Sequence, residues 1–275
     1  MPLSLARHLP WLFAALAALN VGGVHAESSC SSDDQPPRSA LVERFISADC
    51  DTCWTELRAP LAQSPAVGIE WILPGQRGDE APLSAAARSD GTARLQALRQ
   101  SAPGASAILP ARAVATPSVN LRVAHGLAFH GYIAVSIEMR PRATPAPAPW
   151  KAWLLLVELI PAGRELSQID RILVRNSLQL EWDSRRAATP DSEHHFFESR
   201  PMQIPEGAEP GRLAVLGWVE DARGQLHGLA LSQCESQRHM LVESGTGPKI
   251  LAPGFFAPVP ADGFRMTGSR PSAHS

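Results

Sequence analysis

Residues 40–53 read ALVERFISADCDTC, and this stretch decides the fold class. Its first part, residues 40–47, is a short run of β-type sequence whose apolar side chains suit burial in a sheet. The run leads directly into a Cys-x-x-Cys motif formed by Cys50 and Cys53. Residues 54–61 then place apolar side chains at the i, i+3 and i+7 spacing of one helix face. The stretch therefore predicts a strand, a cysteine-bearing turn and a helix.

The residues that follow continue the alternation of strands and helices. Residues 67–73, VGIEWIL, indicate a second strand that ends at a Pro-Gly turn. Residues 83–102 are rich in Ala, Leu, Arg and Gln and predict one or two helices. Residues 114–123 indicate a third strand, with Thr116 and Pro117 near its start. This order is the βαβ pattern of an α/β unit.

The second half of the chain is dominated by strand-like segments. Several of them alternate between apolar and polar side chains, as strands with one buried face do. We predict an antiparallel β-sandwich of six to eight strands here, and therefore an α+β fold class for the whole chain. The strand-like segments are residues 132–139, 150–160, 172–182, 194–204, 213–220 and 226–234.

The N-terminus has the features of a cleavable secretory signal. Arg7 supplies positive charge, residues 11–24 are mostly apolar, and a small residue, Ala26, ends the segment. A membrane anchor is the alternative, but a spanning helix needs about 20 consecutive apolar residues, and this run is shorter. We predict cleavage near Ala26, a periplasmic or secreted location and no stable membrane insertion.

These patterns divide the chain into five parts. We predict a signal peptide at 1–26, a disordered leader at 27–38, an α/β domain with the Cys-x-x-Cys motif at 39–126, the β-sandwich at 127–250 and a loose tail at 251–275.

The spacing of the two central cysteines suits thiol chemistry. Cys50 would sit at the N-terminus of the predicted helix, where unpaired N–H groups and the helix dipole favour a thiolate. Cys53, one turn later, could attack a mixed disulfide formed at Cys50. Cys50 is therefore the candidate nucleophile and Cys53 the candidate resolving thiol. Asp49 and Asp51 flank Cys50 and would raise its pKa through like charge, which argues against an extreme oxidant.

Two other interpretations of the pair Cys50 and Cys53 stay open. A zinc site needs four ligands, and the chain has neither a second Cys-x-x-Cys nor a His-x-x-x-His run. The adjacent His194 and His195 would point to opposite faces of a strand, so we predict no metal. A static disulfide is the stronger alternative in an exported protein. The protein would then be a non-catalytic binding or structural protein of the envelope.

The placement of Thr116 and Pro117 after these elements resembles the thioredoxin superfamily. In that fold a cis-proline opens a strand beside the Cys-x-x-Cys motif and presents a backbone edge to the substrate. The resemblance implies that residues 39–126 form a thioredoxin-like domain and that Thr116 and Pro117 bind substrate. A plain loop-ending Thr-Pro is the alternative, since only about 5–6% of X–Pro bonds are cis.

The chain is also similar to a bacterial family of secreted proteins of unassigned function with the signature V-E-L-F-T-S-x-x-C-x-x-C. In that family a thioredoxin-like half precedes a β-rich half, and the likeness covers roughly residues 40–234. The chain departs from the family at Trp54 and Thr55, where prolines are usual. The family itself implies no particular enzymatic activity. The residues on the signature are Val42, Glu43, Phe45, Ser47, Cys50 and Cys53.

Cys30 and Cys234 remain as a second pair. They could form a disulfide that ties the leader to the β-sandwich, or they could be free thiols, because sequence does not determine connectivity. Four histidines are weak candidates for acid–base chemistry, because none has a Ser or Asp partner in a recognisable motif. They are His125, His130, His194 and His195.

The composition limits the partners. A net charge of −2 gives no reason to expect nucleic acid. Thiol–disulfide exchange needs no metal or organic cofactor, so we predict none. The predicted partner is a protein that carries a thiol or a disulfide, either a substrate or a redox partner; the oligomeric state is not predicted.

Overall fold

The structure is a computed structural model that describes residues 30–56, 60–114, 118–142, 149–182 and 195–234. The predicted signal at 1–26 and the predicted tail at 251–275 lie outside these residues. No helix in the described part of the chain is both long and apolar enough to cross a membrane.

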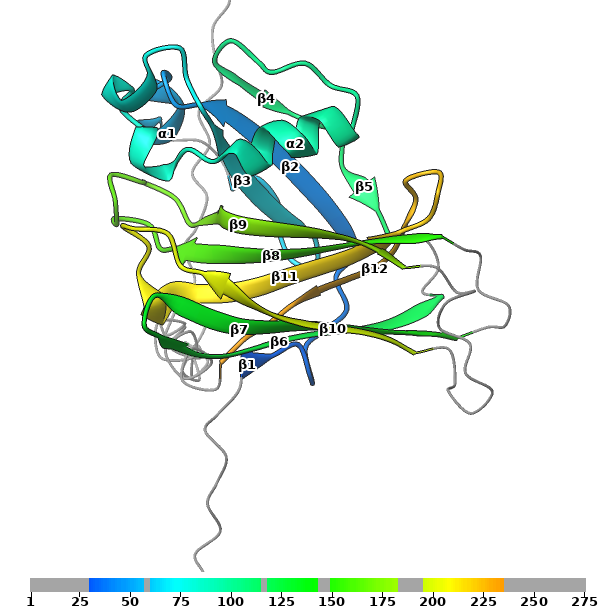
Figure 1. Cartoon of the computed structure of the whole chain (residues 1–275). Coiled ribbons are helices and arrows are strands. Elements are labelled where there is room, and N and C mark those ends of the chain that lie inside the picture. The colour runs from blue at the N-terminus through cyan, green and yellow to red at the C-terminus, as the bar shows by residue number, and fades with distance from the viewer. Residues whose placement is uncertain (1–29, 57–59, 115–117, 143–148, 183–194, 235–275) are drawn as a thin grey trace, which may run out of the picture.

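Two β-sheets form the body of the protein (Figure 1). The smaller sheet has the strand order β1-β6-β7-β10: β1 is Cys30–Ser31, β6 Val119–Phe129, β7 Tyr132–Pro141 and β10 Phe196–Gln203. The larger sheet has the order β12-β11-β8-β9-β3-β2-β4, with β5 also paired to β2. Its strands are β2 Ala40–Ser47, β3 Val67–Leu73, β4 Ser106–Ile108, β5 Arg112–Ala113, β8 Trp150–Ile160, β9 Arg171–Trp182, β11 Leu213–Glu220 and β12 Leu226–Leu231.

Helices are short and few in the described chain. The helix predicted over 54–61 is a single turn, α1 (Thr52–Thr55), because the backbone is extended again at Glu56. The helical region predicted over 83–102 contains α2 (Ser89–Ala97). The other helical segments of the described chain are 3-10 helices at Gly78–Glu80, Ser84–Ala86 and Pro210–Arg212.

The N-terminal elements have the predicted α/β order. Strand β2 leads through the cysteine turn to β3, which pairs with it in parallel, and α2 precedes β4, which pairs with β2 antiparallel. The prediction of a third strand of this unit at 114–123 is wrong. Strand β5 ends at Ala113, and β6, which begins at Val119, belongs to the smaller sheet. On the side of β2 opposite β3 lie β4 and β5, which are too short for a periodic signal.

The second half forms the predicted sandwich, and the α+β class is confirmed. Strand β8 is buried on both faces, so its alternate residues enter different cores. Leu154 and Leu156 face the smaller sheet, whereas Leu155 and Val157 share a core with Leu95 of α2. Helix α2 therefore covers one face of the larger sheet and the smaller sheet covers the other (Figure 1).

The two predicted parts of the chain share one sheet. Strand β3 pairs in parallel with β9, with Glu70 opposite Leu173. The boundary predicted at residues 126 and 127 falls within β6. The α/β elements and the sandwich therefore meet in a continuous sheet.

The leader predicted as disordered makes specific contacts where the structure describes it. Cys30 is buried and lies opposite His125 of β6, and the Ser32 amide donates to the Val123 carbonyl oxygen at 2.9 Å. This part of the leader therefore belongs to the folded protein, because its backbone pairs with β6.

Gly217 of β11 lies where the two sheets pack together, and a substitution at this position tests that contact. A Cβ there would lie 2.6 Å from Val123 Cγ1 and 3.0 Å from Ile137 Cδ1 of the smaller sheet. Gly217→Ala should overpack this interface and lower the free energy of unfolding by about 1–3 kcal/mol, measured by urea denaturation. Gly104→Ala is the control, because a Cβ there meets open space among the described residues. Equal losses in the two variants would contradict the packing.

Candidate functional site

Cys50 and Cys53 form a disulfide just beyond the C-terminal end of β2. Their Cα atoms are 5.4 Å apart, and Cys53 lies within α1. Cys53 is 5% exposed and packs in a core with Trp54 and Ile72, whereas Cys50 lies at the edge of that core and is half-buried. Cys50 is therefore the more exposed residue of the pair.

An ionised carboxylate precedes Cys50. Asp49 accepts hydrogen bonds from the backbone amides of Gln76, at 2.6 Å, and Arg77, at 3.2 Å. The Gln76 amide, together with the amide and guanidinium of Arg77, lowers the pKa of Asp49. Gly75 allows this approach, since a Cβ there would lie 2.3 Å from Asp49 Oδ1. The Arg77 guanidinium lies 3.4 Å from Asp49 Oδ1 and offsets part of the negative charge that the sequence predicts to act on Cys50.

Two buried arginines hold the carbonyl groups of the cysteine turn. Arg44 of β2 donates to the Cys53 carbonyl oxygen at 3.0 Å, and Arg171 of β9 donates to that of Trp54 at 2.7 Å. The guanidinium of Arg171 also lies 4.5 Å from the Trp54 ring centroid. A one-turn helix leaves its carbonyl groups without intrahelical partners, and these side chains supply them.

Glu70 of β3 joins the two arginines. Its Oε1 accepts from Arg44 at 3.2 Å and from Arg171 at 2.6 Å, and all three side chains are at most 4% exposed. The three side chains, two cationic and one anionic, carry a net positive formal charge among themselves. Glu70 Oε2 has no hydrogen-bond partner among the described residues, and a cavity of about 520 Å³ opens beside Glu70 and Arg171.

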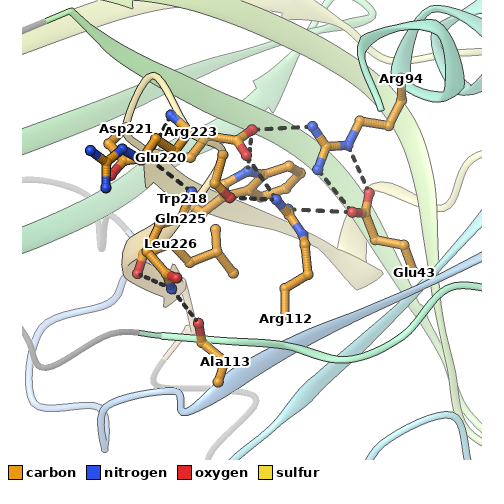
Figure 2. Close-up of polar contacts among 11 residues, drawn as sticks. Glu43, Arg94, Arg112, Ala113, Trp218, Glu220, Asp221, Arg223, Gln225 and Leu226 are labelled. Atoms are coloured by element: carbon orange, nitrogen blue, oxygen red, sulfur yellow. Dashed lines mark hydrogen bonds and ion pairs between the residues drawn. The ribbon is translucent and has the colours of Figure 1, made fainter. Parts of the chain in front are cut away.

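A second buried network lies on the α2 side of β2 (Figure 2). Arg94 of α2 donates to both carboxylate oxygens of Glu43, at 3.0 and 2.9 Å, and to Glu220 at 3.2 Å. Arg112 donates to Glu220 at 2.7 Å. Burial opposes ionisation of Glu220, but Arg94 and Arg112 outweigh it and lower its pKa. Ionised Glu220 therefore connects α2 to the end of β11.

Sequence reasoning found the cysteines but missed the charged residues around them. The available signal was a charge inside an apolar strand, as at Arg44 in ALVERFIS and Glu70 in VGIEWIL. A charge there is buried and must be paired. The partner Arg171 is 101 positions from Glu70 in the chain, so no local pattern could identify it.

Thr116 and Pro117, predicted to bind substrate, lie outside the described residues. The Val114 amide before them donates to the Ser39 carbonyl oxygen, at the N-terminal end of β2. Ser118 after them contacts His227 of β12 at 2.8 Å. The cysteines follow the opposite end of β2. Among the described residues, Cys50, Cys53 and the buried arginines make up the candidate site.

The second cysteine pair is bonded. Cys30 and Cys234 form a disulfide, the first of the two alternatives left open by the sequence. His125 is 6% exposed and burial lowers its pKa, so its imidazole is neutral at pH 7. His130 lies in the turn between β6 and β7, and His195 lies 3.0 Å from Glu138. His194 lies outside the described residues.

No protein-family model matches the sequence, and no curated protein matches it significantly. Among solved structures, HBP35 of Porphyromonas gingivalis aligns over 81% of this chain and 80% of its own, with 9% sequence identity and a TM-score of 0.42. A domain of the outer membrane lipoprotein Omp28 from the same organism aligns over 44% of this chain and 90% of its own, with 8% identity and a TM-score of 0.26. These similarities are too low to carry a functional argument.

Removal of Arg171 should be costly. Arg171→Met leaves the Trp54 carbonyl oxygen without its donor and leaves Glu70 with one of its two buried cations. We expect a loss of about 3–5 kcal/mol in the free energy of unfolding, measured by urea denaturation. Arg200→Met is the matched control, because the Arg200 side chain is 60% exposed. A loss below that of the control would show that the triad does not hold the turn.

Removal of Arg94 should destabilise the protein in a pH-dependent way. Arg94→Met leaves Arg112 as the remaining cation on Glu43 and Glu220 among the described residues, and should lower the free energy of unfolding at pH 7 by about 3–5 kcal/mol. Because the folded-state pKa of Glu220 is lowered, its contribution is present above the unfolded pKa and is lost as pH falls through the folded value. The difference from wild type should narrow at acidic pH. Exposed Arg99→Met should show neither effect, and a pH-independent loss would contradict the pairing.

Proposed function

We propose that this protein is an exported thiol–disulfide exchange protein in which Cys50 and Cys53 are the redox pair. The observation that carries the proposal is the unequal exposure of the two cysteine residues: Cys50 is half-buried, and Cys53 is 5% exposed within an apolar core. An exchange pair needs one sulfur that a partner can reach and one that reacts only within the protein.

The exchange begins from the oxidised pair. A thiolate of the partner protein attacks the Cys50 sulfur, the Cys50–Cys53 bond breaks, and Cys53 leaves as a thiolate. A second partner thiolate then attacks the partner sulfur of this mixed disulfide and releases Cys50. The partner gains a disulfide, and its two electrons remain on Cys50 and Cys53. The reverse sequence reduces a partner disulfide.

The buried arginines favour an exchange in which Cys53 is the leaving thiolate. Cys53 must carry negative charge as it leaves, and its own carbonyl oxygen is bound to Arg44 in a triad that is positive overall. A nearby cation stabilises a thiolate. The triad therefore favours Cys53 as the leaving thiolate, and the greater exposure of Cys50 makes it the residue that an incoming thiolate attacks.

The proposal assigns a periplasmic or secreted location, with a partner protein that carries a thiol or disulfide and no organic cofactor. A static Cys50–Cys53 disulfide in a non-catalytic envelope protein is the competing function. The two functions differ in the reduction potential of the pair and in the reactivity of Cys50.

Single cysteine variants distinguish the two functions. Reduced Cys53→Ser, which keeps the accessible Cys50, should form a mixed disulfide with 5,5′-dithiobis(2-nitrobenzoate) at least about tenfold faster than reduced Cys50→Ser, which keeps buried Cys53. The release of thionitrobenzoate measures both rates. Wild type should titrate in a glutathione series and catalyse insulin reduction.

The double variant Cys30→Ser/Cys234→Ser is the control, because it keeps the Cys50–Cys53 pair and should retain the wild-type rate of insulin reduction. Equal reactivity of the two single variants would overturn the assignment of Cys50. A pair that stays oxidised below about −300 mV would establish the static disulfide instead.

A further inference from the structure

We propose that Cys30, Cys234 and His125 form a binding site for a thiophilic d10 metal ion, of which Zn²⁺ is the representative, once the Cys30–Cys234 disulfide is reduced. A ring nitrogen of His125 and the two sulfur atoms all lie within 4.8 Å of one another. Two thiolates and an imidazole are a set that zinc binds, with the fourth position left for water.

The strand register brings the three residues together. Cys30 of β1 lies directly opposite His125 of β6. On its other side, the bridge between Ser31 and Gln233 places Cys234 opposite Cys30. Directly opposed residues of antiparallel strands project their side chains to the same face. The three ligand atoms therefore lie next to one another on the same face of three neighbouring chain segments.

In the described part of the chain, the hydrogen bonding of His125 leaves one ring nitrogen free to accept a metal ion. Its Nδ1 lies 2.9 Å from the Gly126 carbonyl oxygen, which can only accept, so Nδ1 carries the proton. The lone pair is then on Nε2, which is buried and has no hydrogen-bond partner among the described residues. A histidine that binds metal commonly donates its other N–H to a backbone carbonyl in this way. A buried polar atom without a partner is otherwise unfavourable.

The segment that carries Cys30 has attachments besides the disulfide. The Ser31 and Gln233 backbones exchange two hydrogen bonds, at 3.2 and 2.9 Å. Asp33 forms an ion pair with Arg122 of β6 at 2.8 Å. Together with the β1–β6 pairing, these contacts hold both cysteines beside His125 after the sulfur–sulfur bond is broken.

The reaction requires a dithiol reductant. The dithiol transfers two electrons and two protons to the disulfide, so that it becomes a cyclic disulfide while Cys30 and Cys234 become thiols. Zn²⁺ then binds both sulfurs and His125 and displaces the two thiol protons. The bound ion would prevent re-formation of the disulfide, because both sulfurs are occupied.

The test uses the Cys50→Ser/Cys53→Ser variant, which leaves Cys30 and Cys234 as the only cysteines. The protein is reduced, freed of reductant under anaerobic conditions and titrated with Zn²⁺ or Co²⁺. We expect one ion per chain, a thiolate-to-cobalt charge-transfer band, and slower reoxidation by air in the presence of Zn²⁺. When His125→Gln is introduced into this variant as well, Zn²⁺ binding should weaken at least about tenfold.

The matched control is His227→Gln, because His227 is a partly buried histidine bound to Ser118 and Asp221 instead of the cysteines. It should leave Zn²⁺ affinity unchanged. Less than one ion per chain, or equal affinity in the His125 and His227 variants, would overturn the site. Loss of the native near-UV spectrum on reduction would also overturn it, because the three ligands would then no longer be held together.

Discussion

The joining of the two halves of the chain in one sheet depends most on the burial of Glu70 in the middle of β3. A carboxylate that is 3% exposed is stable as an anion only when it is paired. Glu70 takes one partner, Arg44, from the neighbouring β2 and the other, Arg171, from β9, 101 positions along the chain. This requirement brings β9 beside β3 and thereby joins the two halves of the chain in one sheet.

The requirement that a buried charge be paired also acts on both faces of β2. Glu43 and Arg44 are consecutive in a strand, so their side chains point in opposite directions. Glu43 pairs with Arg94 on the α2 face, and Arg44 reaches Glu70 and the cysteine turn on the other. Buried ion pairs add little net stability compared with apolar packing, but any alternative arrangement leaves a charge unpaired. We therefore interpret them as determinants of one particular packing of β2.

The sequence was informative where the signal is local. Apolar periodicity and turn residues predicted the order of strands, the cysteine turn and the α+β class. It was uninformative where partners are distant: nothing near Cys30 indicates that His125 lies opposite it, and nothing near Glu70 indicates Arg171. Residues 119–123 of the strand predicted at 114–123 belong to β6 of the smaller sheet, because apolar alternation reports burial of a face and not the identity of the neighbouring strand.

The short helix α1 changes the physical basis expected for cysteine reactivity. The sequence argument relied on a helix dipole at Cys50, but α1 is a single turn, and a macrodipole grows from aligned peptide units over several turns. The fixed charges that the structure places near the cysteines include Asp49, paired with Arg77, before Cys50, and Arg44 at the Cys53 carbonyl oxygen. The proposed reactivity at this turn consequently depends on the strands, because β2, β3 and β9 carry Arg44, Glu70 and Arg171.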